Sequence, residues 1–210
     1  MSAASSSRRA SPSRATEGNG RPRVLIAEDE ALIRLDLREM LQEEGYDVIG
    51  EAADGEQAVA LAMDLHPDLV ICDVKMPKMD GIAAAAQIAE KRIAPVVILT
   101  AFSQRDLIER ARDAGAMAYL VKPFQKSDLI PAIEMALGRF EQIVSLENEN
   151  ADLAERLEAR KIIDRAKGRL MDEHSLSEAA SWRFLQKAAM DSRRKIHEVA
   201  SDVVAGALTP

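Results

Sequence analysis

Residues 69–73 read Leu-Val-Ile-Cys-Asp, a run of four apolar residues that ends in a carboxylate, and three similar runs occur in the chain. Residues 24–29 read Val-Leu-Ile-Ala-Glu-Asp, residues 96–100 read Val-Val-Ile-Leu-Thr, and residues 118–122 read Ala-Tyr-Leu-Val-Lys. Short continuous apolar runs are typical of parallel strands that are buried on both faces. If all four runs lie in one parallel sheet, their polar ends meet at its carboxyl edge.

Helical patterns separate these runs, which indicates a doubly wound α/β fold. The sequence predicts five strands, at 23–27, 46–51, 69–72, 96–99 and 117–121. It predicts helices at about 30–43, at 55–65, after Asp80-Gly81 and at 104–113. In the first helix we expect five side chains to face the core: Leu32, Leu35, Leu37, Met40 and Leu41.

Length and composition limit what the rest of the chain can be. At 210 residues and 47% hydrophobic content, the chain can bury one ordinary domain and a smaller one. The single cysteine, Cys72, excludes a disulfide framework and is expected to be a buried thiol. No apolar stretch approaches the roughly 18 residues of a membrane span. We therefore expect a cytoplasmic protein that does not enter membranes.

Charge and composition divide the chain into regions, although the net charge is only −7. Residues 24–160 contain 14 basic and 27 acidic residues, whereas residues 161–210 contain nine basic and seven acidic ones. Among the parts expected to fold, only the C-terminal one is therefore mild enough in charge to meet a polyanion. Four regions are predicted: a disordered tail at 1–22, an α/β domain at 23–126, a long linker helix at 127–160, and a three-helix output domain at 161–206.

The second half of the linker helix carries a heptad pattern. Ile143, Leu146, Asn150, Leu153 and Leu157 are spaced by three or four residues. A polar Asn at an a-like position fixes the register of two-stranded coiled coils, so the pattern predicts a homodimer through residues 143–157. The alternative is an amphipathic helix that packs within its own monomer, since two heptads are short.

The polar strand ends have the chemistry of a metal-assisted phosphoryl site. In doubly wound sheets, ligands bind outside the carboxyl ends of the strands. Glu28, Asp29 and Asp73 offer the oxygen ligands that Mg²⁺ prefers, and Asp73 can attack phosphorus to give an acyl phosphate. Lys122 and Thr100 can neutralise and hydrogen-bond the added oxygens. A phosphatase could use the same carboxylates, although the lysine–threonine pairing and the appended helices argue against an enzyme.

Residues 23–125 resemble the receiver domain of bacterial two-component response regulators. The resemblance lies in the acidic pair Glu28-Asp29, the loop Asp73–Pro77 with Asp80-Gly81, and the strand ends Leu99–Ala101 and Lys122–Phe124. Glu28 departs mildly from the family pattern, in which Asp is commoner at that position.

The resemblance implies a flavodoxin-like fold and phosphorylation of Asp73 by a sensor histidine kinase. It implies that Mg²⁺ is held by Asp29, by Asp73, by the Lys75 backbone carbonyl and, through water, by Glu28. It also implies that Thr100 and Tyr119 reposition on phosphorylation, while Lys122 binds the phosphoryl group.

Residues 145–206 resemble the ANTAR output domain, in the stretches Arg165–Met171, Ala179-Ala180, Leu185-Gln186, Ala188–Met190 and Val199-Ala200. That family binds RNA hairpins that compete with transcription terminators, and the whole chain resembles actinobacterial regulators that control antitermination by phosphorylation. Structured RNA is read through loop bases and phosphates. The candidate RNA contacts are Arg165, Lys167, Arg169, Arg193, Arg194 and Lys195, with Trp182 or Phe184 as stacking platforms.

Other interpretations of the output end stay open. The basic side chains can form a solvated surface, and the aromatic ones can pack the small core. A DNA-binding regulator needs base-reading side chains at the start of its recognition helix, but residues 175–180 read Ser-Leu-Ser-Glu-Ala-Ala. The remaining alternative is an output that binds another protein through the coil.

Overall fold

The computed structural model describes residues 20–101 and 105–210. Residues 1–19 of the predicted tail at 1–22 therefore lie outside the described residues. The chain divides into two compact units, residues 1–142 and 143–210. The first unit contains one parallel sheet with the strand order β2-β1-β3-β4-β5. Its strands are β1 (Arg23–Ala27), β2 (Asp47–Ala52), β3 (Leu69–Asp73), β4 (Val96–Thr100) and β5 (Ala118–Val121). The predicted doubly wound fold is confirmed, with every strand within one residue of its predicted bounds.

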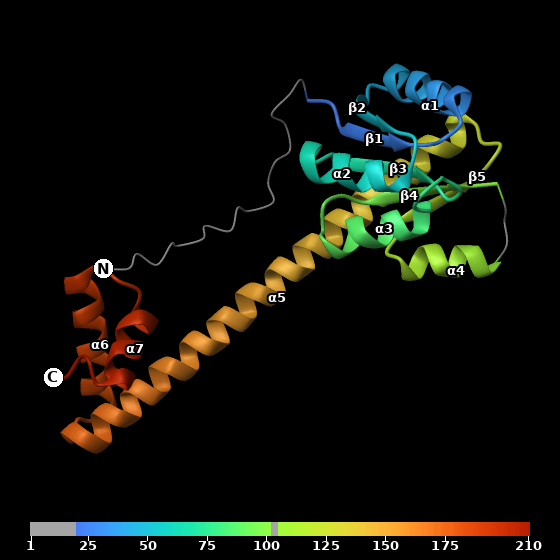
Figure 1. Ribbon diagram of the computed structural model, residues 1–210. Coiled ribbons are helices and arrows are strands. Elements are labelled where there is room, and N and C mark those ends of the chain that lie inside the picture. The colour runs from blue at the N-terminus through green and yellow to red at the C-terminus, as the bar shows by residue number, and fades with distance from the viewer. Residues whose placement is uncertain (1–19, 102–104) are drawn as a thin grey trace, which may run out of the picture. The chain divides into compact units, whose positions relative to one another are not determined.

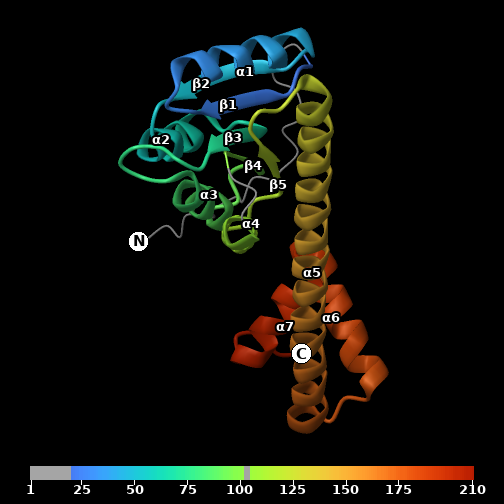
Figure 2. The same ribbon diagram turned by 90° about the vertical axis from the view of Figure 1, so that its right-hand side faces the viewer.

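Helices cover both faces of this sheet (Figures 1 and 2). On one face, α1 (Ala31–Glu43) and the first turns of α5 (Lys126–His174) pack against β1, β3 and β4. On the other face lie α2 (Gly55–Leu65), α3 (Gly81–Glu90) and α4 (Arg105–Asp113). The strand residues of β1, β3 and β4 are almost all buried, which explains their continuous apolar runs.

The core face of α1 differs from the prediction. Leu37 and Leu41 are fully buried, but Leu32 is 78% exposed and Leu35 is 38% exposed. Because a helix turns 100° per residue, the stripe that contains Leu37 and Leu41 continues through Ile33, one turn earlier, and not through Leu32 or Leu35. The prediction that Leu32 and Leu35 face the core was wrong.

The second unit consists of the C-terminal part of α5 with α6 (Glu178–Ser192) and α7 (Ile196–Ala205). Its core contains Ala166 and Leu170 of α5, Leu185 and Ala189 of α6, and Val199, Ala200 and Val203 of α7. The predicted linker helix and first output helix are a single helix in the structure. None of the described helices is long and apolar enough to cross a membrane.

Candidate functional site

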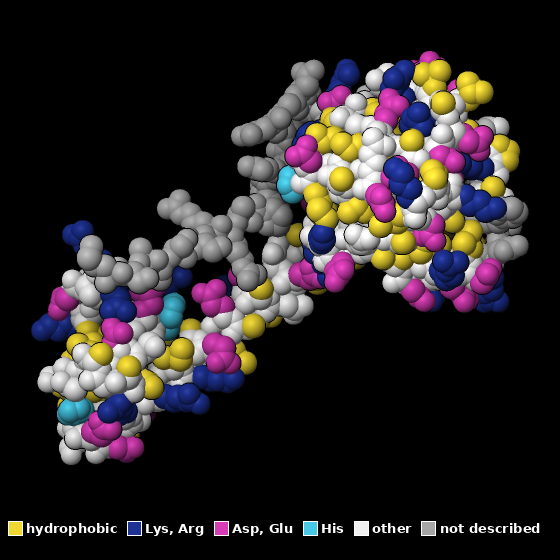
Figure 3. Space-filling view, in the orientation of Figure 1, with side chains coloured by type: hydrophobic (Ala, Val, Ile, Leu, Met, Phe, Trp, Pro, Cys, Tyr) yellow, Lys and Arg dark blue, Asp and Glu magenta, His cyan; other side chains and the backbone are white. Residues whose placement is uncertain are grey.

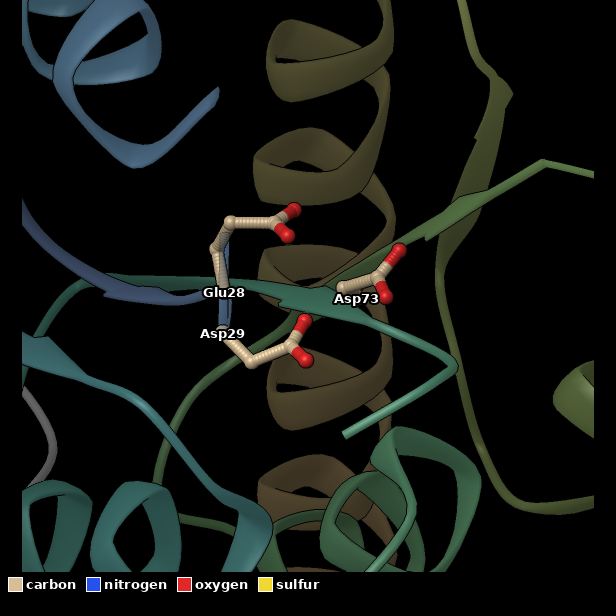
Figure 4. Close-up of side chains that lie close together, drawn as sticks. All are labelled: Glu28, Asp29 and Asp73. Carbon is tan, nitrogen blue, oxygen red and sulfur yellow. The ribbon is translucent and has the colours of Figure 1, made fainter. Parts of the chain in front are cut away.

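The polar residues at the strand ends meet at the carboxyl edge of the sheet, as the sequence predicts. Glu28 and Asp29 directly follow β1, and Asp73 ends the neighbouring strand β3. In Figure 4, the side chains of Glu28 and Asp29 extend toward Asp73. Each of the three offers a carboxylate oxygen within 4.8 Å of the others. Thr100 ends β4 and Lys122 follows β5, so four strands contribute to one crevice.

Lys122 joins two of these carboxylates. Its Nζ lies 2.7 Å from Glu28 Oε2 and 2.7 Å from Asp73 Oδ1. The Glu28 side chain is fully buried, and burial raises the pKa of its carboxyl group although the hydrogen bond from Lys122 opposes the shift. Burial alone would lower the pKa of Lys122, but its hydrogen bonds to Asp73 and Glu28 outweigh burial and raise it. The ammonium group therefore stays charged and compensates buried negative charge.

The loop between β3 and α3 fixes Asp73 from the other side. The Lys75 backbone N–H donates to Asp73 Oδ2 at 3.0 Å, so both carboxylate oxygens of Asp73 accept a hydrogen bond. Lys78 anchors the same loop through an ion pair of 2.6 Å to Asp54, the N-cap residue of α2. The crevice around Asp73 forms an open cavity of about 580 Å³, which Asp29, Thr100 and Lys122 also line.

Tyr119 lies near this site in sequence but does not line the cavity. It pairs with Ile98 in the sheet register, and its side chain is 46% exposed, whereas Thr100 is 2% exposed. The structure thus brings together Glu28, Asp29, Asp73, Thr100 and Lys122, with Tyr119 outside the cavity.

Sequence reasoning missed Arg34, which supports the acidic crevice from α1. Its guanidinium donates to the backbone carbonyl of Glu28 and to the carboxylate of Glu51, to which Arg38 also pairs. These bonds hold the end of β1 against α1. No sequence signal singles out Arg34, because its partners lie on the strand end and on β2 and become neighbours only through sheet pairing.

The donor set of the crevice fits a hard divalent cation. The carboxylate oxygens of Glu28, Asp29 and Asp73 lie close together, and Asp29 and Asp73 also line the open cavity. Asp29 is exposed, and the buried Asp73 lines the open cavity, so water can complete the coordination shell that Mg²⁺ retains. A single ammonium group, Lys122, pairs with two of the three carboxylates.

Comparisons with known proteins agree with this geometry. Residues 24–134 match the family model of the response regulator receiver domain, and residues 151–204 match that of the ANTAR domain. The chain belongs to the response regulators that join a receiver domain to an ANTAR domain. It is 64% identical over 189 residues to the transcriptional regulatory protein PdtaR of Mycobacterium tuberculosis, covering 90% of this chain and 92% of PdtaR. The members of this family are transcriptional regulators, so the expectation that the chain is not an enzyme is confirmed.

Three further similar proteins match just over half of the chain. The chemotaxis protein CheY of Thermotoga maritima is 38% identical over 112 residues, covering 53% of this chain and 93% of CheY. The solved CheX–CheY–BeF3–Mg+2 complex of Borrelia burgdorferi aligns with a TM-score of 0.52 and 32% identity, over 54% of this chain and 88% of that one. The receiver domain of the putative regulator NarL of Mycobacterium tuberculosis aligns with a TM-score of 0.54 and 27% identity, over 56% and 97%.

In the ANTAR unit of this response regulator, three of the six predicted RNA contacts form ion pairs of 3.5 Å or less with other described residues. Lys167 pairs with Asp164 and Glu178 at 3.0 Å each. Arg169 binds Glu173 and the Val204 carbonyl, and Arg194 binds Asp202 and Glu198. These three side chains hold α5, α6 and α7 together.

The other three candidates are more accessible. Arg165 and Arg193 are exposed and form no ion pair with another described residue, and Lys195 lies 4.0 Å from Glu155 with its side chain 71% exposed. Of the aromatic candidates, Phe184 packs against the core of the unit, whereas Trp182 is 37% exposed.

Proposed function

We propose that this response regulator is a phosphorylation-controlled antiterminator: a sensor histidine kinase phosphorylates Asp73, and the phosphorylated chain binds RNA hairpins in the cytoplasm. The observation that carries the proposal is that one chain contains both a receiver domain with an acidic crevice and an ANTAR domain. The domain limits we propose are those of the sequence analysis, with the receiver at 23–126, a linker at 127–160 and the output at 161–206.

Phosphoryl transfer to Asp73 requires an ionised carboxylate oxygen aligned with the phosphorus of a phosphohistidine. A bond forms between that oxygen and phosphorus while the phosphorus–nitrogen bond breaks, and the imidazole leaves. Lys122, 2.7 Å from Asp73 Oδ1, is close enough to bind a phosphoryl oxygen after the transfer. The buried Thr100 lines the same cavity and is the candidate hydrogen-bond donor to a second oxygen.

Asp29, Asp73, the Lys75 carbonyl and, through water, Glu28 are the groups that we propose to hold Mg²⁺. When bound, the ion neutralises charge on the phosphoryl oxygens. The clustering of the three carboxylates supports this assignment. The solved complex of a CheY with BeF3 and Mg+2 supports it by analogy, since that protein shares 32% identity with the receiver domain.

The phosphoryl group is expected to act on the output by shifting a two-state equilibrium. We propose that Thr100 turns toward the phosphoryl group and that Tyr119 moves with it. The helix α5 begins four residues after Lys122 and continues into the ANTAR unit. Its first turns are tied to the receiver by a 2.7 Å hydrogen bond from the Tyr46 hydroxyl to Glu134, which supports α5 as the connecting element.

We propose that the phosphorylated form pairs through residues 143–157. Leu146, Leu153 and Leu157 are 59%, 61% and 55% exposed, so this heptad seam remains uncovered in the single chain. Two ANTAR units brought together in this way could bind two hairpins of one transcript. Leu153→Glu is expected to keep the chain monomeric in sedimentation experiments with phosphodonor, while Leu35→Glu serves as a control on an exposed leucine outside the seam.

The decisive experiment measures the affinity of the full chain for RNA hairpins with and without acetyl phosphate and Mg²⁺. We expect tighter binding with the phosphodonor for the wild-type chain and no change for Asp73→Ala. Equal wild-type affinity in both states would rule out the switch. Crosslinking of bound RNA in cells, beside the Asp73→Ala control, would identify the transcripts.

A further inference from the structure

Two large apolar side chains on α6, Trp182 and Met190, are partly or largely exposed. Trp182, Gln186 and Met190 are spaced by four residues, so they lie along one side of the helix. Trp182 is 37% exposed and Met190 is 78% exposed. The core of the unit takes Leu185 and Ala189 from α6 instead. An exposed tryptophan and methionine on one helix face indicate a contact surface.

This face leads into an apolar cavity of about 520 Å³ where α5, α6 and α7 meet. Ile163, Ala189 and Ile196 supply apolar lining, and the remaining lining residues are Gln186, Met190, Arg194, Lys195 and His197. Its volume falls within the roughly 300–1,000 Å³ of small-molecule pockets. The cavity therefore suits a flat apolar group that also offers hydrogen-bonding atoms at its edge.

The charge around this surface selects the kind of occupant. Residues 179–197 contain five Lys or Arg residues and a single acidic residue. Lys187 and Arg193 are exposed and form no ion pair with any other residue that the structure describes. No carboxylate is among the described residues that line the cavity. In Figure 3, Lys and Arg side chains lie among hydrophobic ones on the visible face of this unit.

We propose that this surface, which we call the α6 groove (Trp182, Gln186, Met190 and the adjoining cavity), binds unpaired bases of an RNA loop. Trp182 stacks on one base, the cavity accepts another, and the side chains of Gln186 and His197 hydrogen-bond its edge. Lys187 and Arg193 bind the flanking phosphates. This inference rests on the proposed RNA-binding function and assigns it to specific residues, which differ largely from the basic residues that hold the helices together.

An RNA loop fits this surface better than a duplex does. A duplex presents stacked bases and a regular phosphate lattice, which would leave the exposed Trp182 and the apolar cavity without a partner. Unpaired bases have free π-faces, and stacking on an aromatic side chain is tolerant of sequence. Specificity would then come from the cavity, where a buried base edge must find hydrogen-bond partners.

The test uses the full chain and a library of RNA hairpins with a constant stem and a randomised loop, beside the same stem without a loop. From the known strength of base–aromatic stacking, Trp182→Ala is expected to weaken binding of wild-type-selected hairpins by about tenfold to a hundredfold. Met190→Ala removes part of the lining of the cavity and is expected to weaken binding of the same hairpins. Trp182→Phe should retain most of the affinity. Met171→Ala is the matched control, because Met171 is 41% exposed in the same unit but lies outside the groove.

Two further readouts separate stacking and phosphate contacts from a general loss of structure. Trp182 is the only tryptophan, so its fluorescence should be quenched by hairpin RNA and not by the loopless stem. Lys187→Ala should weaken binding to all loops similarly and reduce the slope of log affinity against log salt by about 0.7 to 0.9. Circular dichroism melts confirm that each variant is folded.

The outcomes distinguish the groove from the function on which it rests. If the wild-type chain binds hairpins and both Trp182→Ala and Met190→Ala bind as tightly, the groove is not the base site while RNA binding stands. If the two variants lose loop and stem binding equally, base recognition by the groove is also refuted. If they bind RNA normally but lose a protein partner, the surface serves protein binding. If the wild-type chain binds no hairpin in either phosphorylation state, the proposed function itself fails.

Discussion

Gly81 allows α3 to approach β3, the strand that ends in Asp73, more closely than any other residue would. A Cβ atom at this position would lie 1.9 Å from the carbonyl oxygen of Asp73 and 3.0 Å from Cys72 Sγ, and real Cβ atoms essentially never approach below 3.0 Å. The two nearest atoms are the carbonyl oxygen and the carbonyl carbon of Asp73, which belong to the backbone, so no side-chain rotation can relieve the clash. Gly81→Ala must therefore separate α3 from β3 by about 1 Å.

The expected cost is at the upper end of the range for overpacked cores, about 3 kcal/mol. For a domain of about 100 residues, such as the receiver, that loss corresponds to a fall in the melting temperature of about 12–24 °C. The displaced carbonyl also carries the Asp73 carboxylate away from Lys122. Since a 1 Å misplacement of a reacting group can reduce a rate about a hundredfold, phosphorylation by acetyl phosphate should slow by a similar factor.

The assay is urea unfolding with two probes. Far-UV circular dichroism follows the whole chain, whereas fluorescence of Trp182, the only tryptophan, follows the ANTAR unit. Gly138→Ala is the control, because nothing lies within 4 Å of the added Cβ and helical Gly→Ala changes stabilise by about 0.5–1 kcal/mol. A Gly81→Ala chain with wild-type stability and a wild-type phosphorylation rate would show that the close packing of α3 on β3 does not position Asp73.

Three further predictions concern packing, pH and capping. Leu37→Ala should lower the free energy of unfolding by about 2–5 kcal/mol, because Leu37 is fully buried. Leu32→Ala should change it by less than about 0.5 kcal/mol, because Leu32 is 78% exposed. Equal changes for the two variants in urea unfolding would contradict the assigned face of α1. The hydrogen bond from Lys78 lowers the pKa of Asp54, so the contribution of the ionised Asp54 to stability is present above about pH 4 and is lost as the pH falls further. In an Asp54→Asn chain, the free energy of unfolding should therefore fall less steeply with decreasing pH. An unchanged dependence on pH would refute this role. Ser177→Ala removes the hydroxyl that accepts a hydrogen bond from the Ala180 N–H at the start of α6. This change should lower the stability of the ANTAR unit by about 1 kcal/mol, as measured by Trp182 fluorescence during urea unfolding. An unchanged unfolding midpoint would mean that the cap is dispensable.

Much of the receiver domain could be predicted because its signals are local. A strand buried on both faces must be apolar along its length, so β1, β3 and β4 are visible as continuous runs. The carboxyl ends of parallel strands share an edge, so the meeting of Asp29, Asp73 and Lys122 followed from chain order and fold class. The assignments of Mg²⁺, kinase and RNA remain predictions, because they concern molecules outside the chain.

Other features depended on which helix face met the sheet. Leucines occur on more than one side of α1, and only packing against β1 and α5 decided that Leu37 is buried while Leu32 is exposed. In the ANTAR unit, six basic residues were equivalent candidates in the sequence. The tertiary structure separated Arg169 and Arg194, which bind carboxylates of the chain itself, from Arg193, which forms no ion pair with another described residue.

The sequence by itself determined the fold class, the order of the strands along the chain and the residues of the acidic crevice, since hydrophobic periodicity and the polar strand ends are properties of neighbouring residues. Only the tertiary structure decided how each charge is used. Lys122 could be placed beside Asp73 from chain order, but its equal contacts with Glu28 and Asp73 depend on the side-chain geometry of the assembled sheet. The same holds for the α6 groove, because a cavity exists only where three helices pack and leave a space between them.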